Sequence, residues 1–401
     1  MPFAAPFLPI LRDPPLLLAA GLLVLFGAHV ASLAPYVSAL AVTVFGLGDG
    51  AYSVVLMVAS VVAVASSIGF GIIADQRANR RGVALATAVF LTIGTGLVPL
   101  APKTPVFVLA HALLLPLSGS FFGQLFALAR LAASLHPDPT RRAVLSTLRA
   151  MFALPWVLVL PVWALVFRAG APVMLVYPVC LVLAVTILLC VWFWWPRDGA
   201  TRWPDPKSGL TFRQSLREIW APAILIRVLA LGTIHGAITL YLVLIGLVFE
   251  AVPGRGAADT ALYAGLTAGL EVPFMLALPL ILGRVPQVKL IFVGAAIYAV
   301  HLAGLPFLAG TALVWVLPVF AAIGGAVVLT QPMAYLQDLM GDRPGAGASL
   351  MALQKLVGDA ICATVFAAGV AVSGYGLTAA TGAALSVIGA GALLVLDRRR
   401  R

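Results

Sequence analysis

Charged side chains are scarce in this sequence. They make up 10% of the 401 residues, whereas hydrophobic residues make up 62% and the mean hydropathy is +1.09. Soluble domains carry about a quarter charged residues and roughly half apolar ones, so a water-soluble fold would leave much of this apolar surface exposed. The scarcity of charge therefore excludes a soluble globular protein and indicates an integral membrane protein.

Cysteines and reactive clusters are also few. Cys180, Cys190 and Cys362 all fall within apolar runs, where a thiol behaves as a small hydrophobic group, so neither a disulfide framework nor a metal site is predicted. The sequence has no phosphate-binding G-x-x-x-x-G-K-[ST] motif and no evident nucleophile with a base and an orienting group. These absences disfavour ATP-driven pumping and enzymatic catalysis, and no cofactor is predicted.

What the sequence contains instead is a series of long apolar runs. A helix needs about 20 mainly apolar residues to cross the hydrocarbon layer of a membrane, and only helices and closed barrels satisfy their backbone hydrogen bonds there. The runs are too long for barrel strands, so the predicted fold class is an all-α membrane protein. Twelve spans are predicted, near residues 15–41, 51–74, 82–101, 106–134, 143–168, 173–196, 219–248, 261–283, 289–308, 311–336, 346–372 and 376–396.

The 25 basic residues, which outnumber 14 acidic ones, are distributed unevenly along the chain. If both termini are cytoplasmic, the loops on the opposite side hold only Lys103, Arg168 and Arg255. Cytoplasmic loops of membrane proteins are enriched in lysine and arginine. The positive charge is therefore interpreted as an orientation signal that predicts cytoplasmic termini, and not as a nucleic-acid interface. The tail at residues 398–401 can also contact anionic lipids.

The longest polar interruption divides the predicted spans into two groups of six. It covers residues 197–217, includes two prolines and two glycines, and predicts a cytoplasmic linker between an N-terminal bundle at 1–196 and a C-terminal bundle at 218–401. Two six-helix halves joined in this way resemble the plan of major facilitator transporters, whose substrate site lies near the middle of the membrane.

A loop after the second predicted span supports this resemblance. Gly71 is followed by Asp75 and then by a basic cluster that includes Arg80 and Arg81, which resembles the cytoplasmic loop motif of the major facilitator superfamily. A carboxylate at such a place can accept hydrogen bonds from a helix N-terminus or from an arginine. The resemblance implies a cytoplasmic gate formed by Asp75, Arg80, Arg81 and Arg130, the last at the end of the fourth span.

Four further stretches resemble the bacterial sugar efflux transporter (Set) family, at residues 124–130, 146–150, 269–273 and 335–340. The resemblance implies proton-coupled export of sugars, glycosides or related molecules by a monomer in the bacterial cytoplasmic (inner) membrane. The implied partners are a small-molecule substrate and membrane lipids, with the proton gradient as energy source. The fifth span lacks the glycine-rich stretch of many exporters in the superfamily, so the direction of transport stays open at this point.

Ionisable side chains inside spans mark candidate sites, because each costs roughly 2.5 to 3.5 kcal/mol to insert and usually faces a cavity or a partner. Glu271 is the predicted proton carrier, since a carboxyl that alternates between apolar and charged surroundings can bind and release a proton. Substrate contact or an ion pair with Lys355 are the alternatives. His235 and Asp359 are further proton-coupling candidates, although Asp359 lies four residues after Lys355 and can pair with it.

Polar and aromatic side chains inside spans are the candidates for substrate binding. Gln124 can both donate and accept hydrogen bonds, as sugar hydroxyls require, and Arg149 can bind them too or can extend to the cytoplasmic interface. Trp156 and Tyr241 can stack on the apolar face of a sugar, although such aromatics also pack in cores or against lipid. Lys355 completes this set. The remaining histidines within spans are expected to be satisfied by a neighbouring carbonyl, and these are His29, His111 and His301.

Three other functions fit parts of the sequence. A multidrug or hydrophobic-metabolite exporter of the same fold would have a cavity poor in groups that match hydroxyls. A membrane enzyme or lipid flippase would need a reactive cluster or a laterally open groove, and a sensor would need a signalling domain for which the short linker and tails leave no room. Proton-coupled sugar efflux is therefore the predicted function, with drug or metabolite export as the alternative.

Overall fold

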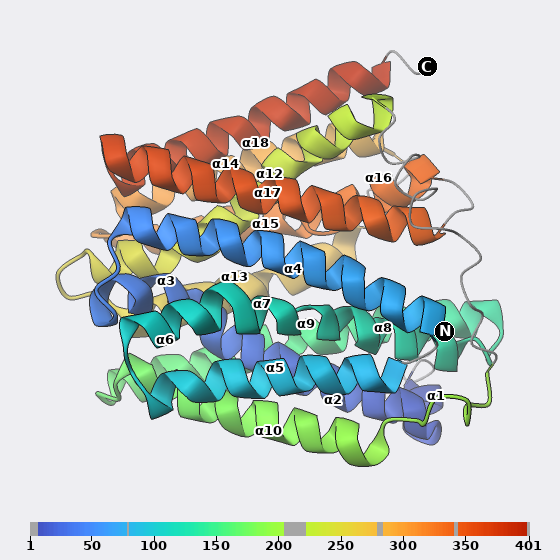
Figure 1. The fold of residues 1–401 in the computed structure, drawn as a ribbon. Helices are drawn as coiled ribbons and strands as arrows, with labels where there is room; N and C mark the ends of the chain where they lie inside the picture. The colour runs from blue at the N-terminus through green and yellow to red at the C-terminus, as the bar shows by residue number, and fades with distance from the viewer. Residues whose placement is uncertain (1–6, 78–79, 204–221, 279–283, 341–343, 399–401) are drawn as a thin grey trace. The chain divides into compact units, whose positions relative to one another are not determined.

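The computed structural model describes the chain except residues 1–6, 78–79, 204–221, 279–283, 341–343 and 399–401. The described residues form helices and their connections, without a β-strand (Figure 1). Twelve helical segments are long and apolar enough to cross a membrane. Each overlaps one predicted span, so the prediction of an all-α protein with twelve spanning helices is confirmed.

The α-helices begin and end as follows: α1 Phe7–Arg12, α2 Pro14–Leu33, α3 Val37–Ala39, α4 Asp49–Arg77, α5 Arg80–Leu100, α6 Thr104–Leu109, α7 Leu115–Ser118, α8 Ser120–Ala133, α9 Asp138–Arg168, α10 Val176–Trp194, α12 Pro222–Glu250, α13 Ala257–Ala277, α14 Gln287–Leu308, α15 Leu317–Val328, α16 Gln331–Met340, α17 Pro344–Val372 and α18 Tyr375–Arg398. The short α1 precedes the first predicted span. Most of the predicted linker, residues 204–217, lies outside the described residues.

Three spans are interrupted instead of running as one regular helix. The first contains a 3₁₀ turn at Ala34–Tyr36 and a π-helical turn at Leu40–Val44, and the fourth contains a π-helical turn at Ala110–Leu114. The tenth breaks between α15 and α16, where the Thr330 amide bonds the Val327 carbonyl. Prolines occur at or near each interruption, and a proline removes one backbone donor. Neighbouring helices and local adjustments of the turn accommodate such breaks in membrane bundles.

The chain forms two compact units. Unit 1 contains residues 1–34, 62–160 and 171–209, and unit 2 contains residues 35–61, 161–170 and 210–401. α4 and α9 therefore contribute residues to both units. The predicted bundle boundaries on either side of the linker stay a prediction.

Unit 1 is held together by apolar packing among α2, α5, α8 and α10. Its core contains fully buried side chains such as Leu23 and Phe121, and Trp203 beyond α10 packs against the same cluster. Gly27 on α2 lies so close to the backbone of Phe152 on α9 that a side chain would not fit there. Small residues at such crossings let membrane helices approach closely.

In unit 2, α12, α14, α17 and α18 lie side by side (Figure 1). Gly232 and Gly236 on α12 face Gly358 on α17. A methyl group added at Gly358 would lie 2.9 Å from both the Gly232 oxygen and the Gly236 nitrogen. This small-x-x-x-small spacing lets membrane helices pack backbone to backbone. The close crossing brings the polar residues of α12 and α17 together.

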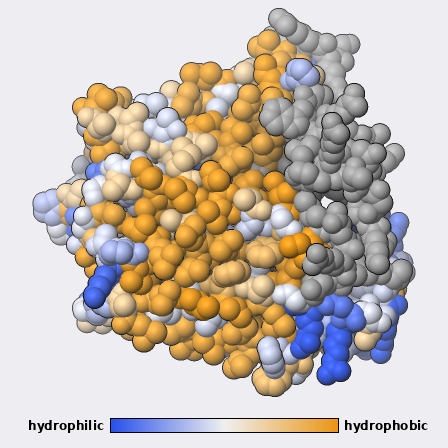
Figure 2. Space-filling model, viewed as in Figure 1, coloured by the Kyte–Doolittle hydropathy of each residue, from blue (hydrophilic) through white to orange (hydrophobic). Residues whose placement is uncertain are grey.

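The surface of the visible helices is largely apolar. Figure 2 shows hydrophobic residues over the middle of these helices and hydrophilic residues near helix ends. On α9, Leu158, Val162 and Leu165 are each more than half exposed, as are Trp192 and Phe193 at the end of α10. Aliphatic residues suit the hydrocarbon layer, and aromatic residues are enriched at the membrane interface. The chain is therefore a multi-pass membrane protein.

Candidate functional site

A buried carboxylate with three partners lies where α12 crosses α17. Asp359 is 8% exposed. Its Oδ1 accepts a hydrogen bond from the Thr239 hydroxyl at 3.1 Å and lies 3.7 Å from Nε2 of His235. The Lys355 ammonium donates to Oδ2 of the same carboxylate. The predicted pairing of Lys355 with Asp359 is therefore present, and it extends to two residues of α12. We call these four residues the Asp359 group.

The glycine crossing explains why α12 joins this group. Gly358 has no side chain, and the ring of His235 occupies the space beside its Cα. His235 and Thr239 are one helical turn apart and so share one face of α12. A buried carboxylate is tolerated when donors match its lone pairs, and the crossing supplies them from a second helix. Thr239 was not predicted, because its spacing of four residues from His235 shows only that the two share a face of α12.

Removing the ammonium should cost more stability than removing the carboxylate. Lys355→Met leaves the buried Asp359 carboxylate without its counter-charge, and breaking a buried ion pair costs roughly 3 kcal/mol before the half-exposed lysine is discounted for solvent screening. In Asp359→Asn the ammonium that stays behind is on a side chain that is 53% exposed, so water replaces the lost counter-charge. We expect the thermal unfolding midpoint of the purified protein to fall by several degrees in Lys355→Met and by less than half as much in Asp359→Asn.

The double variant Lys355→Met/Asp359→Asn supplies the control for this comparison. Because the two residues share one interaction, the combined loss should be smaller than the sum of the single losses. Strict additivity would show that Lys355 and Asp359 do not stabilise each other, and wild-type stability of Lys355→Met would show that the buried carboxylate does not need the ammonium.

Glu271 lies on α13, apart from the Asp359 group. Its carboxyl packs against Gly325 on α15, in the space that a larger side chain at this position would take. It forms no hydrogen bond or ion pair with any residue in the described part of the chain, so the alternative of a static pair with Lys355 is not found. Its carboxyl lies near the hydroxyls of Tyr241 and Tyr298. A carboxyl inside a span without a fixed partner is available to a proton or a ligand.

Aromatic side chains from three helices of unit 2 surround His301. The ring centres of Tyr241 and Tyr298 lie 4.8 and 5.1 Å from that of the histidine. The Tyr263 hydroxyl shares a hydrogen bond of 2.8 Å with His301 Nδ1. Tyr241 is only 6% exposed, so its ring, predicted to stack on a sugar, is packed among side chains of the protein itself. In unit 1, His29 bonds the Thr95 hydroxyl and His111 bonds the Tyr177 hydroxyl, so the partners of these histidines are hydroxyls and not the expected carbonyls.

In unit 1, the predicted substrate ligands lie on α8 and α9 in different surroundings. Gln124 is 6% exposed, and its Oε1 has no hydrogen-bond partner among the residues that the structure describes. Arg149 is exposed, and its guanidinium lies 5.9 Å from the centre of the Phe126 ring, within the range of a cation–π contact. Trp156 is half-buried on α9. A buried amide oxygen without a donor is costly, so Gln124 is well suited to accept a hydrogen bond from a ligand.

The start of α5 carries two of the predicted gate residues. Oδ1 of Asp198 accepts hydrogen bonds from the backbone amides of Arg80 and Arg81, at 3.1 and 3.2 Å. A carboxylate at a helix N-terminus satisfies free amides and complements the helix dipole. This role of Asp198 was not predicted. The side chain of Asp75 lies outside the described residues, and Arg130 is exposed at the end of α8, so the gate stays a prediction.

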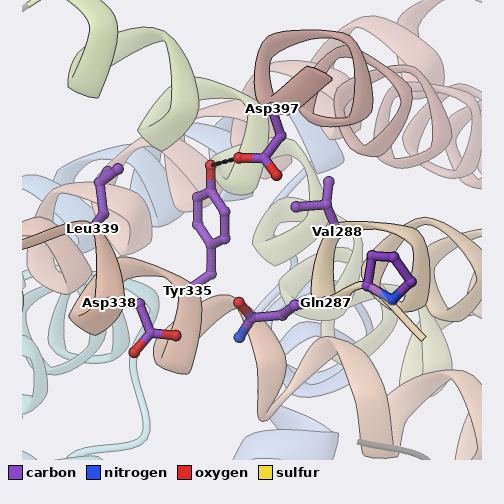
Figure 3. A pocket seen from close by; sticks show the side chains of 7 residues that line it. Gln287, Val288, Tyr335, Asp338, Leu339 and Asp397 are labelled. Carbon is purple, nitrogen blue, oxygen red and sulfur yellow. Dashed lines mark hydrogen bonds between the residues drawn. The ribbon is translucent and has the colours of Figure 1, made fainter. Parts of the chain in front are cut away.

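A second polar cluster joins the ends of α12, α16 and α18. Arg227 is buried, and its Nε donates to the Tyr335 hydroxyl at 3.1 Å while a terminal nitrogen donates to the Leu396 carbonyl. The Tyr335 hydroxyl donates in turn to Asp397 at 3.4 Å (Figure 3). The sequence placed Arg227 within a span without identifying this role. Such a buried arginine with several acceptors ties three helix ends together.

Beside this cluster is a cavity of about 220 Å³ (Figure 3). Its lining consists of Pro286, Gln287, Val288, Tyr335, Asp338, Leu339 and Asp397. The predicted site residues are absent from this lining, so the cavity is separate from the Asp359 group and from Glu271.

Known families and curated proteins resemble this sequence over most of its length. The model of the Major Facilitator Superfamily matches residues 127–363. A protein of Deinococcus radiodurans named "Putative sugar efflux transporter" is 31% identical over 392 residues, which cover 94% of this chain and 96% of the relative. "Sugar efflux transporter A" of Dickeya chrysanthemi is 30% identical over 242 residues, 59% of this chain and 58% of the relative.

Solved structures resemble the fold over nearly its whole length. The nucleoside transporter NupG superposes with a TM-score of 0.72 at 15% identity and covers 97% of this chain and 99% of its own. A D-xylose-proton symporter superposes with a TM-score of 0.70 at 17% identity, covering 94% of this chain and 96% of its own. At these identities the likeness concerns the fold alone.

Proposed function

This chain belongs to the major facilitator superfamily, and we propose that it exports sugars, glycosides or related small molecules across a bacterial cytoplasmic membrane in exchange for protons. Membership makes the chain a transporter and not an enzyme. The observation that carries the substrate class is the 31% identity to a relative named for sugar efflux, since it extends over 94% of the chain. The predicted family resemblance is confirmed by the same alignments.

The proposed mechanism is alternating access, in which the substrate site opens to one side of the membrane at a time. Glu271 takes up a proton from the outer side and releases it to the cytoplasm as sugar moves outward. The absence of a fixed partner for this carboxyl among the described residues supports the assignment. The Asp359 group, with all four members already paired, stabilises the bundle in which Glu271 acts.

Gln124 and Arg149 are proposed to bind the sugar. The Gln124 oxygen is buried without a donor among the described residues, and a sugar hydroxyl would supply one. Arg149 is exposed and carries several donors, which suits the oxygen atoms of a sugar. Trp156 lies seven residues beyond Arg149 on α9, about two helical turns away, and offers an aromatic surface to the same ligand.

The test is transport by the purified protein in liposomes with an imposed proton gradient. A panel of labelled glycosides, a nucleoside and a hydrophobic cationic drug separates the substrate classes. We expect glycosides to move in the direction opposite to the protons. The proton gradient should stimulate this flux, and a protonophore should abolish it. The proposal would be refuted if the drug were transported and no sugar were. It would also be refuted if the rate of sugar transport were the same with and without the proton gradient.

A further inference from the structure

Several buried polar atoms in unit 2 have no hydrogen-bond partner among the described residues, and three of them lie on α12, α13 and α14. They are the hydroxyl oxygens of Tyr241 and Thr267 and the Nε2 atom of His301. The three residues are 6%, 5% and 0% exposed, so bulk solvent does not reach them. Unpaired buried polar atoms are uncommon in folded proteins, and each requires a physical explanation.

These atoms gather beside the proposed proton carrier. The Tyr241 hydroxyl lies near Thr267 and Glu271 without a hydrogen bond to either, and the Tyr241 ring centre is 4.8 Å from that of His301. Tyr263, Thr267 and Glu271 follow one another at intervals of four residues on α13, and therefore share one face of that helix. From Tyr263 to Glu271 this face extends about 12 Å along the helix axis.

The hydrogen bond of His301 to Tyr263 leaves the other ring nitrogen unpaired in either tautomer. If the Tyr263 hydroxyl donates to Nδ1, then Nε2 carries a proton that needs an acceptor. If Nδ1 donates to the hydroxyl instead, then Nε2 is an acceptor that needs a donor. Both tautomers leave a buried nitrogen unpaired at the centre of the aromatic cluster. An ordered water satisfies such groups, because it typically makes about three hydrogen bonds to buried polar atoms.

An ion pair lies near the start of α13, at the end of this helix face opposite Glu271. Arg255 donates to Asp259 at 2.9 Å near the start of α13. The Arg255 guanidinium lies 5.4 Å from the centre of the Trp315 ring, which in turn lies 6.2 Å from that of Tyr263. This end of the helix adjoins the loop that the distribution of basic residues predicts to be external. The polar residues therefore connect Glu271 with the side from which the driving protons enter.

We propose that Tyr241, Thr267 and His301 hold ordered water and form with it a proton route between Glu271 and the Asp259 end of α13. The inference rests on the proposed function, because it supplies the path for the coupling proton. Each hydroxyl, water or imidazole accepts a proton on one side and gives one up on the other. One proton thus reaches Glu271 for each proton that leaves the Asp259 end, and no group along the route keeps a net charge.

Removal of a single hydroxyl tests the route. Thr267→Val keeps the shape of the side chain and deletes the oxygen, so the relay loses one link. We expect proton-driven sugar flux to fall roughly tenfold or more, whereas exchange of labelled for unlabelled sugar, which moves no net proton, should change much less. Thr364→Val is the matched control, because Thr364 is exposed on α17 and bonds the backbone of its own helix. It should leave both rates at the wild-type level.

The outcomes separate the route from the function itself. If the wild-type protein shows no proton-driven flux, the proposed function fails. If the wild type is proton-driven and Thr267→Val is equally so, the function stands and the route is refuted. An equal loss of both fluxes in Thr267→Val would also refute the route, since it would indicate a general defect in transport.

Thermal stability gives a second readout that does not depend on transport. If no water bonded the Thr267 and Tyr241 hydroxyls, each would be an unsatisfied buried polar group. Thr267→Val and Tyr241→Phe would then remove a destabilising group and raise the unfolding midpoint. If the hydroxyls bind ordered water, their removal leaves that water and its other partners unsatisfied, so the midpoint falls by a few degrees. A rise in both variants would overturn the proposal.

Discussion

Glu271→Gln should reduce proton-driven sugar flux by roughly a hundredfold or more, the scale expected when an essential proton-transfer group is removed. Glutamine keeps the size and hydrogen-bonding capacity of the side chain but cannot release a proton. The carboxyl packs against Gly325 and has no fixed partner in the described part of the chain, so the substitution should disturb the fold little. Flux into liposomes, measured with and without an imposed gradient, gives the result directly.

A second carboxylate provides the control for this variant. Glu250 is exposed at the end of α12, in the same unit, and Glu250→Gln removes the same charge from a residue outside the proposed route. This control should keep its response to the gradient. A Glu271→Gln protein whose sugar flux still rises with the gradient would exclude Glu271 as the proton carrier and return that role to His235 or Asp359.

Gly358→Ala should destabilise unit 2 clearly. The new methyl would lie 2.7 Å from His235 Cδ2 and 2.9 Å from backbone atoms of Gly232 and Gly236. The histidine can turn away, but the backbone of α12 cannot, so α17 must shift. Overpacking of this kind costs about 1 to 3 kcal/mol. The shift also pulls Asp359 away from its two partners on α12, and we expect the unfolding midpoint to fall by several degrees.

Gly391→Ala distinguishes crowding from the change of residue type. Gly391 lies on α18 of the same unit, where an added methyl would contact only the Phe292 ring, at 3.8 Å, among the described residues. Alanine is intrinsically more helix-stabilising than glycine, so this variant should be neutral or slightly more stable. If Gly358→Ala and Gly391→Ala had the same unfolding midpoint, the backbone contact between α12 and α17 would not contribute to stability.

The number and type of helices could be predicted from the sequence because the membrane imposes a length and a polarity on each span. Every predicted span overlaps a helical segment for this reason. The interruptions could not be predicted in the same way. Pro35 and Pro116 signal that a donor is missing, but the 3₁₀ or π-helical turn that results depends on the helices packed around it.

The candidate site was predictable where the interaction is local. Lys355 and Asp359 are one turn apart on a single helix, and that spacing is sufficient to expect a pair. The contributions of His235 and Thr239 depend on a crossing between helices whose residues are more than a hundred positions apart. The hydrogen bond that the Arg80 amide donates to Asp198 could not be predicted for the same reason. The two residues are 118 positions apart in the sequence.

For Glu271, the sequence predicted a functional carboxyl but not its surroundings. Its position inside a span predicted a functional carboxyl, because an ionisable group in that position is costly. From the sequence, an ion pair with Lys355, a proton and a substrate contact were alternative explanations for this carboxyl. The structure places the carboxyl beside Gly325 on α15 and shows no pair with Lys355 among the described residues, whereas the proton and the substrate contact stay predictions.

The division of the chain has a mechanical consequence. Within helical spans the chain passes between the compact units at residues 34–35, 61–62 and 160–161. Pro35 and Pro161 occupy two of these positions, and a helix that already lacks a backbone hydrogen bond there bends with little further loss. α4 has neither proline nor glycine at Val61 and Val62, so its sequence does not weaken the helix there. Bending of these three spans is therefore expected first at Pro35 and Pro161 and last at Val61 and Val62.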